Sequence, residues 1–288
     1  MREIMINWWR AFRFSVLSTA HWARITIAIM QFVLLGGLAV ISTVISARPG
    51  GGKGNVWDAA FTVFSGFTPE ASLFEIIFSF TPLLFFMLLF GNLAKEDLYL
   101  QPMYILLRIG SRRTWWWGKV ASLAAAALCY YGLGMAVVIV FACRFLPLSG
   151  NWSSFMLLRT GWFQTGLIST GAFIFWALLL SAGTALGSVL AQWILSMVTG
   201  NSFYAVIITM FLLVTPTRIG VFEPGLIKWL PGTQGSLLCH TAFNPLMPGF
   251  SLTWSLIYNF LFTFICAVMG MWLLDRIDLY GNRGDETN

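Results

Sequence analysis

The sequence predicts an all-α polytopic membrane protein with six transmembrane helices. The chain of 288 residues is 58% hydrophobic and only 10% charged, whereas about a quarter of the residues in soluble globular proteins are charged. Its uncharged stretches suit helices of about 20 residues. They also lack the two-residue alternation that is typical of outer-membrane barrel strands. We therefore expect one transmembrane domain that covers residues 1–288.

The first 23 residues carry too many charges to span a membrane, but on a helical wheel they separate into two faces. The apolar face holds Met5, Trp8, Trp9, Phe12 and Val16. The opposite face holds Glu3, Asn7, Arg10, Arg13 and His21. This separation predicts an interfacial helix over residues 1–23, with Trp8 and Trp9 as anchors at the membrane surface.

Six apolar stretches are long enough to be considered as spans. They are residues 25–47, 76–93, 120–143, 165–193, 203–216 and 254–274. No charged residue occurs between Arg159 and Arg218, and this interval is too long for one helix, so we place a break at residues 199–202. Pro82 predicts a kink whose freed carbonyl is satisfied by neighbouring helices. Gly183 and Gly187 form a GxxxG motif, which favours packing within the chain over a dimer seam.

The external region 217–253 is broken repeatedly by proline. Between these breaks, residues 225–230 and 233–243 are apolar enough to form short helices that dip into the bilayer and return. Six spans place both termini on one side of the membrane, and the basic residues favour the cytoplasm for them. The cytoplasmic side would then hold Arg2, Arg10, Arg13, Arg24, Lys95, Arg108, Arg112, Arg113, Lys119, Arg276 and Arg283.

Residues 95–119 are the one long charged interruption between two apolar runs, and we expect a cytoplasmic docking helix there. The segment begins with Glu96 and Asp97, which suit a helix start. Its middle and basic end carry Leu106, Leu107, Arg108, Ser111, Arg112 and Arg113. Trp115, Trp116 and Trp117 follow, and we expect them to anchor a hinge at the membrane interface before the third span. An alternative is a basic loop that binds anionic lipid.

Motifs for chemistry are scarce in this chain. It has no GxxxxGK[ST] sequence, so any ATP must be hydrolysed by a partner, and it has no HExxH metal motif. The basic residues lie beside apolar spans and form no stripe, which argues against nucleic-acid binding. Cys239 and His240 are adjacent, but neighbouring helical residues point about 100° apart, so a structural role is favoured over a nucleophile and base. The span centres lack ionisable residues, which argues against proton-coupled transport.

This layout resembles the membrane subunits of type 2 ABC exporters, the ABC-2 permease superfamily. In that family a glutamate after span two precedes Leu-Leu, Ser-Arg and Gly-Lys pairs, which here are Glu96, Leu106-Leu107, Ser111-Arg112 and Gly118-Lys119. The resemblance implies a coupling helix within residues 95–119 and re-entrant helices between spans five and six. It also implies a separate P-loop ATPase in two copies that binds ATP and Mg, and a second permease copy or a paralogue.

These observations predict a permease subunit of an ATP-driven exporter in a bacterial cytoplasmic membrane, surrounded by lipid. Its cargo would be a hydrophobic or amphipathic solute such as a peptide antibiotic, a drug or a lipid. The chain itself would be no enzyme and would hold no cofactor. Two other classes stay open: a membrane enzyme or accessory subunit that uses Cys239 and His240, and a sensor or immunity protein that binds a ligand without transport.

Overall fold

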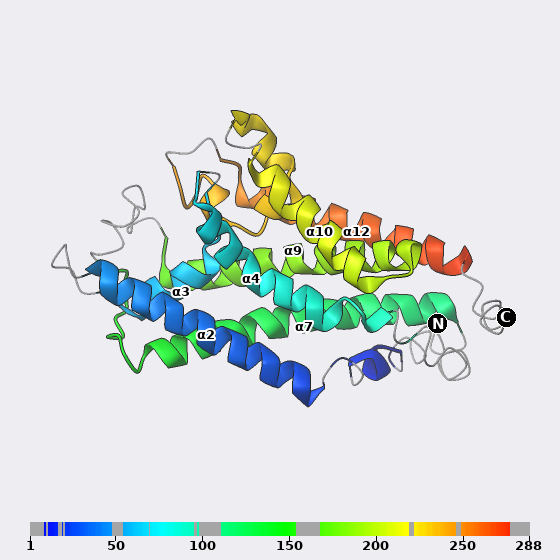
Figure 1. The fold of residues 1–288 in the computed structure, drawn as a ribbon, viewed down its shortest axis with the longest axis horizontal. Coiled ribbons are helices and arrows are strands. Elements are labelled where there is room, and N and C mark those ends of the chain that lie inside the picture. The colour runs from blue at the N-terminus through cyan, green and yellow to red at the C-terminus, as the bar shows by residue number, and fades with distance from the viewer. Residues whose placement is uncertain are drawn as a thin grey trace.

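The long helices of this protein run side by side along one axis. The structure is a computed structural model that describes residues 9, 11–16, 19, 21–47, 54–68, 70–94, 97, 111–153, 168–218, 222–245 and 249–276. Within them, helices α2 (Trp22–Ala47), α7 (Arg112–Ala142), α9 (Thr170–Thr199) and α12 (Leu252–Arg276) form an elongated bundle (Figure 1). Each of the four is long and apolar enough to cross a membrane. The protein is therefore an all-helical membrane protein, as predicted.

Two further apolar helices are shorter. Helix α4 (Leu73–Phe90) has 18 residues, and α10 (Ser202–Val214) continues into the 3-10 turn η1 (Thr215–Arg218). At 1.5 Å per residue, α4 is about 27 Å long, slightly less than a hydrocarbon core of about 30 Å. The colours of Figure 1 show that the six helices alternate in direction along the bundle. The alternation is consistent with six crossings, but crossing by α4 and α10 stays a prediction.

The predicted break between the fourth and fifth apolar stretches is confirmed. Gly200 has a left-handed φ of 69° after the end of α9, a conformation that glycine adopts without a steric penalty. Asn201 then caps α10, because its side-chain oxygen accepts hydrogen bonds from the backbone N–H groups of Phe203 and Tyr204. The third stretch differs from the prediction. Helix α7 begins at Arg112, eight residues before the expected start at residue 120, so the tryptophan triplet lies inside the helix.

Helix α9 contacts α4, α7, α10 and α12, and its glycines permit the closest of these contacts. A Cβ atom at Gly183 would lie 3.3 Å from the Asn259 side chain of α12, and one at Gly187 would lie 2.7 Å from Phe262 Cδ1. The GxxxG motif therefore packs within the chain, as expected. Gly134 of α7 has the same role against the Phe32 ring of α2.

Pro82 removes one backbone donor from α4, and the polar groups at this turn are satisfied from three helices. The Thr81 hydroxyl donates to the carbonyl of Ile77 one turn back, at 2.9 Å. Gln31 Nε2 of α2 donates to the carbonyl of Thr81 at 3.4 Å, and the Tyr130 hydroxyl of α7 donates to the carbonyl of Pro82 at 2.9 Å. Proline at this position frees the carbonyl of Phe78, one turn back, so the prediction that neighbouring helices satisfy the freed carbonyl stays a prediction.

The described part of region 217–253 contains 3-10 turns, and the longest of them is as long as the short helix expected at residues 225–230. They are η2 (Pro224–Trp229), η3 (Pro231–Thr233) and η4 (Leu237–Cys239). The interval 233–243 does not form one helix because its polar groups bond to the connection between α3 (Val56–Phe64) and α4. Ser236 Oγ accepts from Phe67 N at 2.8 Å and donates to Phe67 O at 2.6 Å, while Leu238 N donates to Ser65 O at 3.2 Å.

The described part of the N-terminal segment contacts the bundle through small side chains. Ala11, Ser15 and Thr19 are buried, and a Cβ atom at Gly118 of α7 would lie 3.0 Å from Ala11 Cβ. Trp9 points away and is 57% exposed. Trp9 thus keeps the exposure that an interfacial anchor needs, whereas Trp8 lies outside the described residues.

Alanine substitutions at Gly132 and at Gly134 of α7 should differ in their effect on the stability of the protein. Gly134→Ala should lower the free energy of unfolding by about 1–3 kcal/mol, because the new methyl group would clash with the Phe32 ring. Gly132 has nothing within 4 Å of an added Cβ, so Gly132→Ala should be neutral or stabilise by up to about 1 kcal/mol through helix propensity. Unfolding in detergent measures both, and equal effects would contradict this packing.

Candidate functional site

The predicted docking segment is described only where it enters the bundle. Asp97, Ser111, Arg112 and Arg113 are described, whereas Glu96, Leu106, Leu107 and Arg108 lie outside the described residues. Ser111 caps α7, because its hydroxyl oxygen accepts from the backbone N–H of Thr114. The two arginines occupy the first turn of α7, so this helix carries the basic end of the segment directly into the bundle.

A buried ion pair connects the two ends of the segment. Lys119 Nζ lies 2.6 Å from Asp97 Oδ2, and the lysine side chain is fully buried while the aspartate side chain is 15% exposed. A buried ammonium is costly unless it is paired and hydrogen-bonded. The sequence interpretation placed Lys119 at the edge of the third span. The earlier start of α7 instead places it inside a helix that is long enough to span, where it holds Asp97 against the bundle.

Trp115 and Trp116 are packing residues, which corrects the expected interfacial hinge at this position. Both side chains are at most 1% exposed. Trp116 Nε1 donates to the carbonyl of Ala267 in α12 at 2.8 Å, and Gly270 leaves room for the indole. The Trp193 ring of α9 packs edge to face against Trp116, with the two ring centroids 5.8 Å apart. The large indole ring fits between the helices because Gly270 allows α12 to approach α7 closely. Trp117 is only partly buried against the core.

A second, exposed ion pair joins α7 to the end of α12. Arg113 Nη2 lies 3.0 Å from Asp275 Oδ2, and Arg113 Nε donates to the same oxygen at 3.3 Å. The arginine side chain is 69% exposed, so the pair is screened by solvent and contributes little stability. Together with the Trp116 hydrogen bond, it joins α7 to α12 at this end of the bundle.

Cys239 and His240 do not form a nucleophile and base. Cys239 Sγ lies 3.4 Å from the carbonyl of Phe67, and burial raises the pKa of this thiol to about 12. His240 Nδ1 contacts the Ser236 carbonyl at 2.8 Å, and its Nε2 contacts Ser255 Oγ at 2.7 Å. Burial lowers the pKa of His240 to about 4. The thiol stays protonated and both imidazole nitrogens contact other groups, so these side chains connect residues 236–240 to α12 and to the α3–α4 connection.

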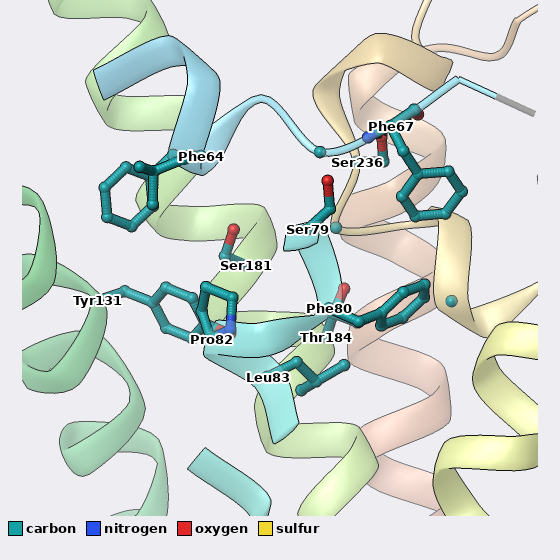
Figure 2. Close-up of a pocket in the computed structure, with 14 residues that line it drawn as sticks. Phe64, Phe67, Ser79, Phe80, Pro82, Leu83, Tyr131, Ser181, Thr184 and Ser236 are labelled. Carbon is teal, nitrogen blue, oxygen red and sulfur yellow. Dashed lines mark hydrogen bonds between the residues drawn. The ribbon is translucent and has the colours of Figure 1, made fainter. Parts of the chain in front are cut away.

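Two adjoining cavities lie beside that connection. The larger, about 770 Å³, is bounded by α2, α3 and α4, with Ser42 and Glu75 among its polar lining residues. The smaller, about 50 Å³, is drawn in Figure 2, where Ser79 of α4, Ser181 and Thr184 of α9, and Tyr131 of α7 line it. The two share Gly66, Phe67 and Ser79 as lining residues. A recess whose mainly apolar lining includes several hydroxyl groups and Glu75 therefore leads from the α2–α4 side of the bundle toward its interior.

Comparison with protein-family models, with curated proteins and with solved structures finds no match to this chain. The sequence did not predict the recess, because its lining comes from elements that are far apart along the chain and contains single serines and threonines in apolar runs. A hydroxyl in such a run resembles ordinary interhelical bonding. The capping pattern Ser72-x-x-Glu75 was the one signal in the sequence that places a charged side chain, Glu75, at the start of α4.

Removing the partner of Lys119 should destabilise the protein more than removing the partner of Arg113. Asp97→Asn replaces the carboxylate that lies 2.6 Å from the buried ammonium with a neutral amide, and we expect the free energy of unfolding to fall by about 3 kcal/mol. Asp275→Asn breaks the exposed pair and should cost less than about 1 kcal/mol.

Thermal unfolding in detergent compares these two variants with the wild-type chain. Lys119→Met supplies a further check, because it leaves only the partly exposed Asp97 unpaired and should cost less than Asp97→Asn. An Asp97→Asn effect no larger than that of Asp275→Asn would contradict the structural role of the buried pair.

Proposed function

We propose that this chain is the permease subunit of an ATP-driven ABC transporter that exports a hydrophobic or amphipathic solute across the bacterial cytoplasmic membrane. A separate P-loop ATPase, in two copies, would bind and hydrolyse ATP with Mg. A second permease copy or a paralogue would complete the pathway. Support comes from an apolar helical bundle without a nucleotide motif in its sequence, and from the resemblance of the 95–119 segment to a coupling helix.

The observation that carries this proposal is the rigid attachment of the basic end of that segment to the bundle. Arg112 and Arg113 begin a helix of 31 residues that has no hinge at the tryptophan triplet. Trp116 and Arg113 link the same turns to α12, and Lys119 holds Asp97. A partner that pushes on this end would displace α7 and α12 together, as rigid-body coupling requires.

The contact residues also define the partner's chemistry. Arg113 keeps most of its surface exposed and Arg112 is partly exposed. Two adjacent guanidinium groups favour an acidic surface on the ATPase and would speed its association. The geometry of Cys239 and His240 gives no comparable support to a membrane enzyme.

Reversing the two charges should weaken the complex with the proposed ATPase subunit. We expect the double variant Arg112→Glu/Arg113→Glu to lose roughly tenfold or more in affinity, because charges of like sign would then meet across the interface. Affinity is measured by titrating purified ATPase into the chain in detergent.

Asp275→Asn is the matched control, because it breaks the Arg113–Asp275 pair without changing either arginine. Full affinity in the double variant would refute docking at this end. A similar loss in both variants would mean that the α7–α12 contact, and not the basic charge, determines affinity.

The orientation of the chain can be tested at Cys143, which is exposed immediately after α7 ends. With cytoplasmic termini, Cys143 faces outward, so a membrane-impermeant maleimide should label a variant with Cys143 as its sole cysteine in intact cells. Cys129 is exposed on the same helix but lies in its apolar middle, and a variant retaining only Cys129 should stay unlabelled. Labelling of Cys143 only after permeabilisation would reverse the proposed topology.

A further inference from the structure

The gap between α2 and α4 has the shape and polarity of a site for an amphiphile. A groove of about 490 Å³ follows these two helices, and its lining is almost wholly apolar. Its lining residues are Ile27, Met30, Gln31, Leu34, Leu35, Leu38, Ile77, Phe78, Thr81 and Phe85. Leu38 and Phe78 also line the 770 Å³ cavity, so the apolar groove and the polar cavity adjoin.

The two parts together are long enough for an alkyl chain. From Ser42 in the polar cavity to Ile27 in the apolar groove, α2 advances 15 residues, which corresponds to about 22 Å of helix. Exposed apolar residues of α2 border this path, namely Ile27, Met30, Leu34, Leu38 and Ile41. An alkyl chain can therefore enter from the lipid side without crossing a polar barrier.

The polar end carries hydroxyl groups and one acidic side chain. Six hydroxyl residues line the cavity, namely Ser42, Thr62, Ser65, Thr68, Ser72 and Ser79. Glu75 is exposed, and its Oε2 accepts from the backbone N–H and the hydroxyl of Ser72 at 2.8 and 2.9 Å. Within the described part of the chain, no lysine or arginine lies within ion-pair distance of Glu75. Arg218 donates instead to the Ala71 carbonyl and does not line the cavity.

We propose that this composite site binds a single-chain cationic amphiphile, with a primary ammonium group beside Glu75 and its alkyl chain in the apolar groove. A primary ammonium has three donors, which suits a carboxylate surrounded by hydroxyl oxygens. A neutral or anionic head of the same size would leave Glu75 without a counter-charge. The claim that this amphiphile is the transported solute rests on the function proposed above. The claim that it binds to the site does not.

Binding is tested on the purified chain without any ATPase. Native mass spectrometry in detergent would compare hexadecylamine, hexadecanol and hexadecanoate, which share one chain and differ in head charge. We expect the wild-type chain to prefer the amine by about tenfold, the range of a charge-assisted hydrogen bond. In Glu75→Gln this preference should fall to about one, while the capping pattern is kept because glutamine also serves at this position.

Two pairs of variants localise the site. Glu70→Gln neutralises a nearby exposed glutamate that does not line the cavity and should keep the preference. Leu38→Trp should obstruct the junction between the two parts and weaken all three probes. Ile45→Trp, on an exposed residue of the same helix outside the lining, should not. An unchanged preference in Glu75→Gln, equal binding of the three probes, or unaffected binding in Leu38→Trp would overturn the proposal.

A transport assay separates this inference from the proposed function. The chain would be reconstituted with its ATPase, and ATP-dependent movement of hexadecylamine would be measured for the wild type and Glu75→Gln. Glu75-dependent binding without any ATP-dependent movement would keep the site and refute export, as expected of a ligand-binding sensor. Movement that is insensitive to Glu75→Gln would keep the exporter and refute the site.

Discussion

Helices that are apolar on every side gain little from hydrophobic burial against one another in a bilayer, and this constraint governs the bundle. Association must come from close packing and from hydrogen bonds between helices. Glycine supplies the first at Gly134 against Phe32 and at Gly187 against Phe262. Large polar-tipped rings supply the second, since Trp116 donates across to α12. The glycines and the aromatic donors therefore both serve to hold the helices together in the bilayer.

The same constraint explains where polar side chains occur. Several helical hydroxyls are satisfied within their own helix, as when Thr43 donates to the Ala39 carbonyl at 2.8 Å and Ser188 donates to the Thr184 carbonyl at 2.7 Å. Such residues need no partner elsewhere. Ser42 and Ser79 differ because they line the recess beside α4. Their position concentrates polarity on one side of an otherwise apolar bundle, and Glu75 adds charge to that side.

Composition and periodicity were sufficient to predict the helical class, the break at Gly200 and the packing face of α9. Each depends on local chemistry: long apolar runs, a glycine before an asparagine cap, and a GxxxG spacing. The start of α7 was misplaced because a run of arginine and tryptophan is typical of a membrane interface. Tertiary contacts overrode that preference, since Gly270 opens a place for Trp116. The recess could not be predicted because its lining residues are distant in sequence.

A polar cluster centred on Tyr130, in the middle of α7, joins this helix to the groove between α2 and α4. The Tyr130 hydroxyl lies 2.6 Å from Gln31 Oε1 and 2.9 Å from the Pro82 carbonyl, so one α7 side chain contacts both groove walls. Gln31 in turn donates to Thr81, and both residues line the apolar groove. Pro82 weakens α4 at this turn, where a missing backbone bond makes bending least costly. On the proposed function, a displacement of α7 would therefore change the width of the groove first at Tyr130.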